Sequence, residues 1–194
     1  MQQWPNTMKQ VILKGKKPVV DSGAFVAPTA VLIGDVTVES GANIWYGAVL
    51  RGDLGSIVVK AGASVQDNVV IHVQPQGQTL IEENVIIGHG VVLHNCVIKR
   101  GAVVGINSVV LDYATVGEEA VVAAGSVVSS KSEIPPRHLA AGIPAKAKKE
   151  LSGDSLWFTQ QGVVVYSHLV QDYLDEGIGV VEEEAKEPED KSDM

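Results

Sequence analysis

The sequence predicts an all-β solenoid, a parallel β-helix of six-residue repeats that is followed by one α-helix. The first observation is an aliphatic residue at every sixth position, in the column Leu80, Ile86, Val92, Ile98, Val104, Val110, Val116, Val122 and Val128. The second is a small or turn-forming residue at fixed offsets before each member of that column. A period of six fits neither a helix nor a simple strand, but it fits a short strand followed by a corner. Three such segments would close a triangular coil of about 18 residues, and stacked coils form a solenoid.

The neighbouring columns indicate how each corner is built. An earlier block repeats the aliphatic rhythm at Leu32, Val38, Ile44, Leu50, Val59, Val65 and Ile71. Two places before the aliphatic residue the side chain is mostly small, as at Cys96, Ala102, Ser108 and Ala114. One place earlier still are residues that tolerate a left-handed backbone, as at Asn95, Gly101, Asn107 and Gly125. We therefore expect an aliphatic interior with tight bends, and we expect Cys96 to be buried filler rather than a metal ligand.

The rhythm breaks twice, and both breaks predict loops. The step widens from six to nine after Leu50, across RGDLGS, and again after Ile71, across HVQPQGQ. Loops on a rigid scaffold commonly carry function. The coils are predicted to end near Pro135 and Pro136, because proline supplies no backbone N–H to a strand ladder.

Four segments follow from this pattern. Residues 1–24 would form an N-terminal extension and cap, and residues 25–146 the β-helix. Residues 147–176 are predicted to hold a C-terminal helix with Ser152 as its N-cap. Residues 177–194 form an acidic tail whose composition predicts disorder.

Charge and composition exclude several classes of partner. Residues 175–194 carry nine acidic and two basic side chains, so the rest of the chain is almost neutral. The sequence has no stripe of basic residues that would predict binding to nucleic acid. It also has no apolar run long enough to span a membrane. The first residues lack the apolar segment of a signal peptide, and a single cysteine excludes an intrachain disulfide. A cytoplasmic protein is therefore expected.

Three of the five histidines, His72, His89 and His94, lie in the repeat region. His72 and His94 follow aliphatic positions on one face, and neighbouring coils are about 4.8 Å apart, so both imidazoles could bind one ion. The six-residue period places His94 one residue away from exact alignment with His72, whereas a four-residue bulge after His72 would align the two. The sequence leaves both alignments open. His89 falls at another corner and cannot reach that ion within its own chain. A neighbouring subunit could supply it, which predicts a cyclic trimer with three shared sites.

The alternative is that each of these histidines faces solvent without a function. His138 and His168 lie outside the cluster and are expected to be incidental.

Three motifs together resemble the γ-class carbonic anhydrase family: RGD at 51–53, VQDNVVIH at 65–72 and IIGHGVVLHNC at 86–96. The resemblance implies a left-handed β-helix that forms a homotrimer with a divalent metal at each subunit interface. The metal would be zinc in the first place, with iron, cobalt or calcium as alternatives. Its ligands would be His72, His89 and His94, and metal-bound hydroxide would hydrate CO2 to bicarbonate.

The same resemblance implies roles for five further residues. Gln66 would orient the hydroxide or the bicarbonate, and Tyr166 would lean toward the site from the C-terminal helix. Arg51, Asp53 and Asp67 would form an interface network that positions Gln66. The plainer alternatives are a surface salt bridge of at most about 1 kcal/mol for Arg51 and Asp53, a turn cap for Asp67, and packing for Tyr166.

The sequence differs from the family prototype in the residues that would transfer protons from the metal site to solvent. The prototype has glutamates near its metal, but here Leu54 follows RGD and the loop VQPQGQ has no carboxylate. Slow turnover is therefore expected, because fast hydration needs a proton route to solvent. Two other functions stay open: a hexapeptide-repeat acyltransferase with a groove for acyl-CoA, and a non-enzymatic metal-binding or assembly protein on the same scaffold.

Overall fold

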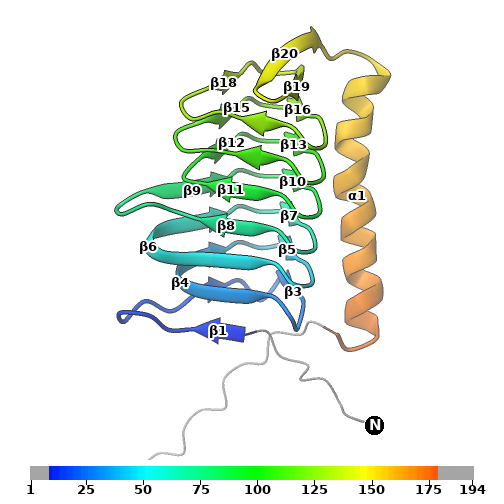
Figure 1. Cartoon of the computed structure of the whole chain (residues 1–194). Helices are drawn as coiled ribbons and strands as arrows, with labels where there is room; N and C mark the ends of the chain where they lie inside the picture. The colour runs from blue at the N-terminus through cyan, green and yellow to red at the C-terminus, as the bar shows by residue number, and fades with distance from the viewer. Residues whose placement is uncertain (1–8, 179–194) are drawn as a thin grey trace, which may run out of the picture.

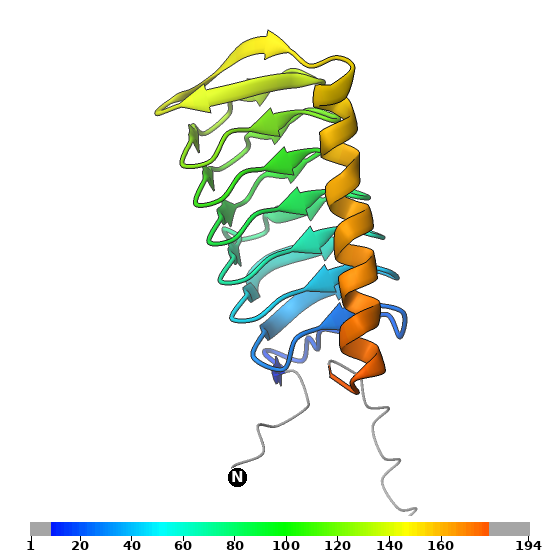
Figure 2. The same cartoon turned by 90° about the vertical axis from the view of Figure 1, so that its right-hand side faces the viewer.

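The computed structural model of the chain describes residues 9–178 and shows a parallel β-helix with a helix beside it (Figure 1). The coils stack along one axis, and α1 (Asp154–Asp175) runs from the last coils back to the first along one face (Figures 1 and 2). The solenoid of six-residue repeats with a C-terminal helix, which the sequence predicts, is confirmed. The helix includes the run Val163–Val165 despite the low helix propensity of valine.

Each coil contributes strands to three faces of a triangular prism. Face 1 contains β4 (Val31–Val38), β6 (Val49–Val59), β8 (Val70–His72), β11 (Val92–His94), β14 (Val109–Val110) and β17 (Val127–Val128). Face 2 contains β2 (Val19–Val20), β9 (Gln78–Ile81), β12 (Val97–Ile98), β15 (Thr115–Val116) and β18 (Glu133–Ile134). Because β4 and β6 bend around the corner between these faces, both faces belong to one 12-stranded sheet.

Face 3 is a separate 8-stranded sheet, and it is the face along which α1 runs. Its strands are β3 (Phe25–Val26), β5 (Asn43–Ile44), β7 (Ser64–Val65), β10 (Ile86–Ile87), β13 (Val103–Val104), β16 (Val121–Val122), β19 (His138–Gly142) and β20 (Ala145–Glu150). At one end of the solenoid β1 (Lys9–Val11) pairs with β4. At the other end β20 folds back antiparallel on β19, so short strands cover both ends of the prism.

The coils continue past the two prolines, so the predicted end at Pro135 and Pro136 is wrong. The backbone N–H of Arg137 donates to the carbonyl of Glu118 across 2.8 Å, and β19 then pairs with β16 on the preceding coil. The prolines occupy a turn, where no ladder N–H is required of them.

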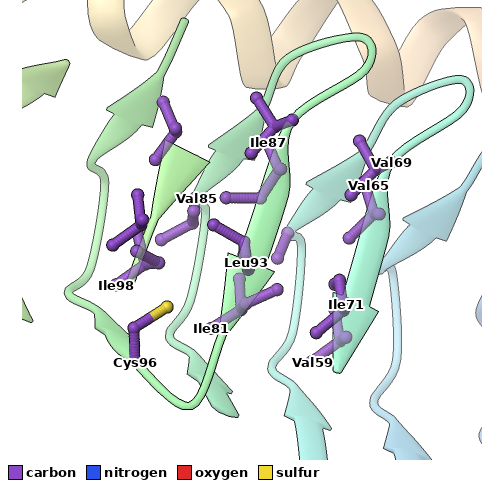
Figure 3. Close-up of a cluster of buried hydrophobic side chains, with 14 of the residues drawn as sticks. Val59, Val65, Val69, Ile71, Ile81, Val85, Ile87, Leu93, Cys96 and Ile98 are labelled. Carbon is purple, nitrogen blue, oxygen red and sulfur yellow. The ribbon is translucent and has the colours of Figure 1, made fainter. Parts of the chain in front are cut away.

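Aliphatic side chains from all three faces fill the interior of the prism (Figure 3). Leu50, Val65 and Ile71 are among the residues with no exposed surface, as the repeat predicts. Cys96 is also fully buried, and desolvation raises the pKa of its thiol to about 12. This confirms that Cys96 is core filler, because a metal ligand would have to be a thiolate.

The interior column differs from the prediction in the coils that precede Cys96. The interior positions there are Ile81, Ile87 and Leu93. Val92, which the period of six places inside, has 38% of its surface exposed. The column shifts by one place because the corner at Asn95 is one residue shorter than the corners after it, and from Ile98 onward the predicted column is confirmed.

The two breaks in the rhythm have different structures. RGDLGS is not a separate loop, because β6 runs through it, but residues 53–56 bulge from the ladder with β4, whose pairing passes from Gly52 directly to Ile57. HVQPQGQ does contain a turn, at 75–76, which projects from the prism between β8 and β9 (Figure 1).

The cap of α1 also differs from the prediction. The N-cap of α1 is Gly153 and makes no side-chain capping bond, so the prediction of Ser152 as the N-cap is wrong. Among the described residues, no helix is long and apolar enough to cross a membrane. The acidic tail from residue 179 onward lies outside the described residues, so its predicted disorder stays a prediction.

Candidate metal centre

His72 and His94 lie side by side at the corner between faces 1 and 2. Strands β8 and β11 pair in parallel with His94 directly opposite His72, and the two ring centroids are 5.2 Å apart. Of the two registers that the sequence leaves open, the structure has the four-residue bulge, formed by the turn that follows His72. We call this the His72–His94 corner.

Carboxylates hold both of these rings from their own chain. Asp53 Oδ1 accepts a hydrogen bond from His72 Nε2 across 2.8 Å, and Arg51 donates to the other oxygen of Asp53 across 2.6 Å. Asp112 Oδ1 accepts from His94 Nδ1 across 2.7 Å. In many metal sites a carboxylate on the nitrogen that does not bind the metal, as Asp112 is on Nδ1 of His94, fixes the orientation of the ring.

Asp112 was not predicted from the sequence, although the sequence contains a signal for it. Asp112 follows His94 by 18 residues, which is the length of one regular coil, so the two residues stack at the same corner. The signal holds for His94 alone, because the carboxylates that contact His72 and His89, Asp53 and Asp67, come earlier in the chain than their histidines.

Asp53 is held as a carboxylate by its two partners. Desolvation acts to raise the pKa of Asp53, but hydrogen bonds from Arg51 and His72 outweigh it, and the pKa is lowered from its ordinary value. The structure thus brings together the predicted Arg51, Asp53 and His72.

His89 lies at a different corner, between faces 3 and 1, in the turn that ends with Gly90. Its Nδ1 lies 2.8 Å from Asp67 Oδ2, and its backbone N–H donates to Gln66 Oε1 across 3.1 Å. Gly90 has a φ of 69°, a left-handed conformation that glycine adopts without strain. We call this the His89 corner.

The helix α1 reaches the His89 corner through Tyr166. The hydroxyl of Tyr166 lies 3.4 Å from His89 Nε2, and Nδ1 on the other side of the ring lies against Asp67. Burial in the first place, and the Asp67 carboxylate in the second, raise the pKa of Tyr166, which keeps the hydroxyl protonated. Tyr166 also packs on Trp45 with ring centroids 5.5 Å apart, so its packing role is present as well.

The two corners stay apart within one chain. The strand β11 separates His89 from His94, at about 3.3 Å per residue. Among residues 9–178, no three His, Cys, Asp or Glu side chains are grouped so that they could hold a metal ion. The structure therefore places two of the three predicted ligands together and the third elsewhere.

The remaining histidines lie outside both corners, as the sequence predicts. His138 Nδ1 donates to the carbonyl of Pro136 across 2.8 Å, at the end of the solenoid. His168 is exposed on α1.

Comparison with solved structures defines the class of protein. A hexapeptide transferase family protein from Anaplasma phagocytophilum is 39% identical, with a TM-score of 0.82 over 85% of this chain and 98% of that chain. A putative acetyltransferase from Bacillus cereus is 37% identical, with a TM-score of 0.86 over 89% of this chain and 99% of that chain. The chain is a hexapeptide-repeat protein.

Curated relatives narrow the class. The carnitine operon protein CaiE of Escherichia coli K12 is 44% identical over 163 residues, which are 84% of this chain and 83% of that protein. Gamma carbonic anhydrase 2, mitochondrial, from Arabidopsis thaliana is 40% identical over 167 residues, which are 83% of this chain but only 60% of that protein. No protein-family model matches. The chain belongs to the hexapeptide-repeat family of the γ-class carbonic anhydrases and CaiE.

Proposed function

We propose that this chain is a carbonic anhydrase-like enzyme that hydrates CO2 reversibly to bicarbonate, at divalent metal sites shared between the subunits of a homotrimer. The observation that carries the proposal is the alignment of His72 with His94, with ring centroids 5.2 Å apart, while His89 stands at another corner. Two imidazoles on one chain and one on the next would complete a three-histidine ligand set, which leaves a coordination position open.

The donor atoms of the three rings suit this arrangement. Asp112 holds Nδ1 of His94 and Asp67 holds Nδ1 of His89, so Nε2 of each ring would bind the cation. At His89 the cation would replace the Tyr166 hydroxyl, which lies 3.4 Å from Nε2. Nε2 of His72 contacts Asp53, and a cation bound there would displace that carboxylate, which Arg51 retains through its other oxygen. A cation held by these rings would act as a Lewis acid that lowers the pKa of water. Zinc is the first choice for neutral imidazole ligands, and iron or cobalt remain alternatives.

Face 1 offers a surface on which the neighbouring subunit would pack. Its outward positions form a row of valines in register: Val31, Val49, Val70, Val92, Val109 and Val127. Val70 and Val92 are 42% and 38% exposed, which is high for apolar residues in a strand. Since face 1 lies between the His72–His94 corner and the His89 corner, a subunit packed on it would lie beside both halves of the ligand set.

The chain's own polar groups would orient the substrate and limit its rate. Gln66 is 6% exposed and its carbonyl oxygen is engaged by His89, so its amide N–H groups are left to donate to bicarbonate. Leu54, 43% exposed, stands where a carboxylate would be needed to carry protons to solvent. Turnover is therefore expected to be slow in weak buffer and to rise with imidazole concentration.

The test is elemental analysis of anaerobically purified protein together with stopped-flow CO2 hydration. We expect one divalent metal per chain and hydration that is lost when a chelator removes the metal. Stoichiometric metal with no hydration in any buffer would contradict the enzyme and favour the non-enzymatic metal-binding protein. The cytoplasmic location expected from the sequence stays a prediction.

The names of the two solved relatives favour one second candidate, an acyltransferase. Such an enzyme would need one catalytic histidine and a groove for acyl-CoA rather than three converging imidazoles. A bound metal that the His89→Ala variant loses would count against acyl transfer, whereas acyl transfer by a metal-free protein would support it.

A further inference from the structure

A cavity of about 440 Å³ lies between α1 and face 3, away from the His72–His94 corner. Its walls on the sheet are Ile86, Val103 and Val121, Val165 of α1 lines its other side, and the cavity opens to solvent. Its polar lining among the described residues consists of Gln66, Gln161 and Tyr166.

The cavity exists because, along one column of face 3, large side chains are followed by glycines. The residues that follow the interior positions stack from coil to coil in the order Ala27, Trp45 and Gln66, of which Trp45 and Gln66 are large and buried. The next two are Gly88 and Gly105, which leave the floor of the cavity bare. A Cβ at Gly105 would lie 2.6 Å from the backbone N of Ala124, so the backbone itself keeps this floor open.

The lining selects a neutral and largely aliphatic ligand. None of the described lining residues is charged, so an anion or a phosphate would lose its hydration without a counter-charge. A water molecule takes about 30 Å³, and cavities of roughly 300–1,000 Å³ hold molecules of drug size. The cavity is therefore far larger than CO2 needs, and it suits an aliphatic chain with one hydrogen-bonding head group.

Two lining residues connect the cavity to the candidate metal ligand His89. Gln66 accepts the backbone N–H of His89 across 3.1 Å, and the Tyr166 hydroxyl lies 3.4 Å from His89 Nε2. A head group that hydrogen-bonds to Gln66 or Tyr166 would compete with these contacts and change how the ring is held.

We propose that the cavity under α1 binds a neutral aliphatic molecule with a single hydrogen-bonding head group, and that its binding changes the metal affinity of the site that contains His89. The binding of this molecule is inferred from the cavity alone, whereas the change in metal affinity rests on the proposed function.

The binding test uses 1-octanol and the full-length protein in titration calorimetry. We expect saturable binding of one molecule per chain, with octanoate of the same chain length binding roughly tenfold more weakly or worse. The Val103→Phe variant should fill the cavity and weaken 1-octanol binding roughly tenfold or more. Val97→Phe is the matched control, because Val97 has the same strand position on face 2 and does not line the cavity.

Several results would overturn the binding site. These are no saturable binding to wild type, equal binding of octanoate, or unchanged binding in Val103→Phe. If Val103→Phe does not fold, as judged by its thermal unfolding, Val121→Phe replaces it with the same expectation, since Val121 lies one coil further along the same wall.

The coupling test measures Zn²⁺ affinity with and without saturating 1-octanol. We expect a change of about fivefold or more in wild type and none in Val103→Phe. Octanol binding with unchanged Zn²⁺ affinity would overturn the coupling alone. Protein that binds 1-octanol but no divalent metal would instead overturn the proposed function and leave the cavity site standing.

Discussion

The three corners of the prism are built from the same repeat, but different parts of the chain support them. At the His72–His94 corner, every partner of the two rings comes from the β-helix itself. At the His89 corner, Tyr166 of α1 contacts the ring in addition to Asp67 of the β-helix. The corner between faces 2 and 3 carries ordinary ion pairs such as Lys99–Glu82 at 2.9 Å, and we call it the charged corner. Two ligands are thus fixed by strand register, whereas the third also depends on how the helix docks.

Loss of a ligand should have the largest effect and should be equal at both corners. We expect His72→Ala, His89→Ala and His94→Ala each to retain less than about a tenth of the wild-type metal content, because two imidazoles bind a divalent cation far more weakly than three. Elemental analysis after gel filtration measures this. The control is His138→Ala, which should keep its metal. Full occupancy in any of the three variants would mean that the ligand is assigned wrongly.

Removal of the outer carboxylate at the His72–His94 corner should have the next largest effect. We expect Asp112→Asn to weaken metal binding by about 10–100-fold, because the carboxylate orients the ring of His94 and raises the basicity of its free nitrogen. Competition with a chromophoric chelator gives the dissociation constant. Asp172→Asn, an exposed change on α1, should leave it unchanged. Equal constants for Asp112→Asn and wild type would remove Asp112 from the site.

Most of the fold can be predicted from the sequence, because a solenoid repeats the same six-residue pattern of aliphatic, small and turn-forming residues. The period of six gives the strands, and asparagine and glycine mark the corners, where Asn95 and Asn107 indeed have positive φ. The short corner at Asn95 is harder to see, because Val92 and Leu93 are both aliphatic and either could face the interior. That single-residue shift also hid the alignment of His94 with His72.

The candidate site was only half predictable for a related reason. Contacts between consecutive coils follow from the repeat, as the 18-residue spacing of His94 and Asp112 shows. The contact of Tyr166 with His89 joins residues 77 positions apart, and it depends on how α1 docks on face 3. No local spacing encodes that docking, so only the family resemblance indicated it.

Removal of the helix contact should have a smaller effect, confined to the His89 corner. We expect Tyr166→Phe to leave metal binding unchanged or to strengthen it by at most about tenfold, since it deletes a hydrogen bond of 3.4 Å to His89 Nε2, the atom that would bind the metal, and keeps the packing on Trp45. Tyr113→Phe, which removes a hydroxyl that accepts a hydrogen bond from Gln74 and does not contact His89, serves as the control. A loss as large as that of Asp112→Asn would show that the helix is as important as the β-helix for the site.

The smallest effect is expected at the charged corner, where it appears as a pH dependence of stability. Desolvation acts to raise the pKa of Glu82, but hydrogen bonds from Lys99 and the Arg100 backbone outweigh it and lower the pKa. The contribution of Glu82 is therefore present above its unfolded pKa of about 4.3 and is lost as the pH falls through its lower folded pKa. Because Lys99 is 42% exposed, we expect Glu82→Gln to cost at most about 1 kcal/mol at pH 7.

Urea unfolding of wild type and Glu82→Gln at several pH values checks this sign. The difference in the free energy of unfolding should shrink as the pH falls below about 4.3. A difference that grows toward acid pH would contradict the assignment.

Metal content of mixed trimers tests most directly whether the sites are shared between chains. His72→Ala and His89→Ala subunits would be unfolded together at equal amounts, refolded and analysed for metal. Each site needs His72 and His94 from one chain and His89 from the next, so random mixing should restore about one quarter of the sites. A mixture of His72→Ala with His94→Ala should restore none, because both residues must come from the same chain. Equal recovery in the two mixtures, or none in either despite confirmed mixing, would contradict a site shared in this way.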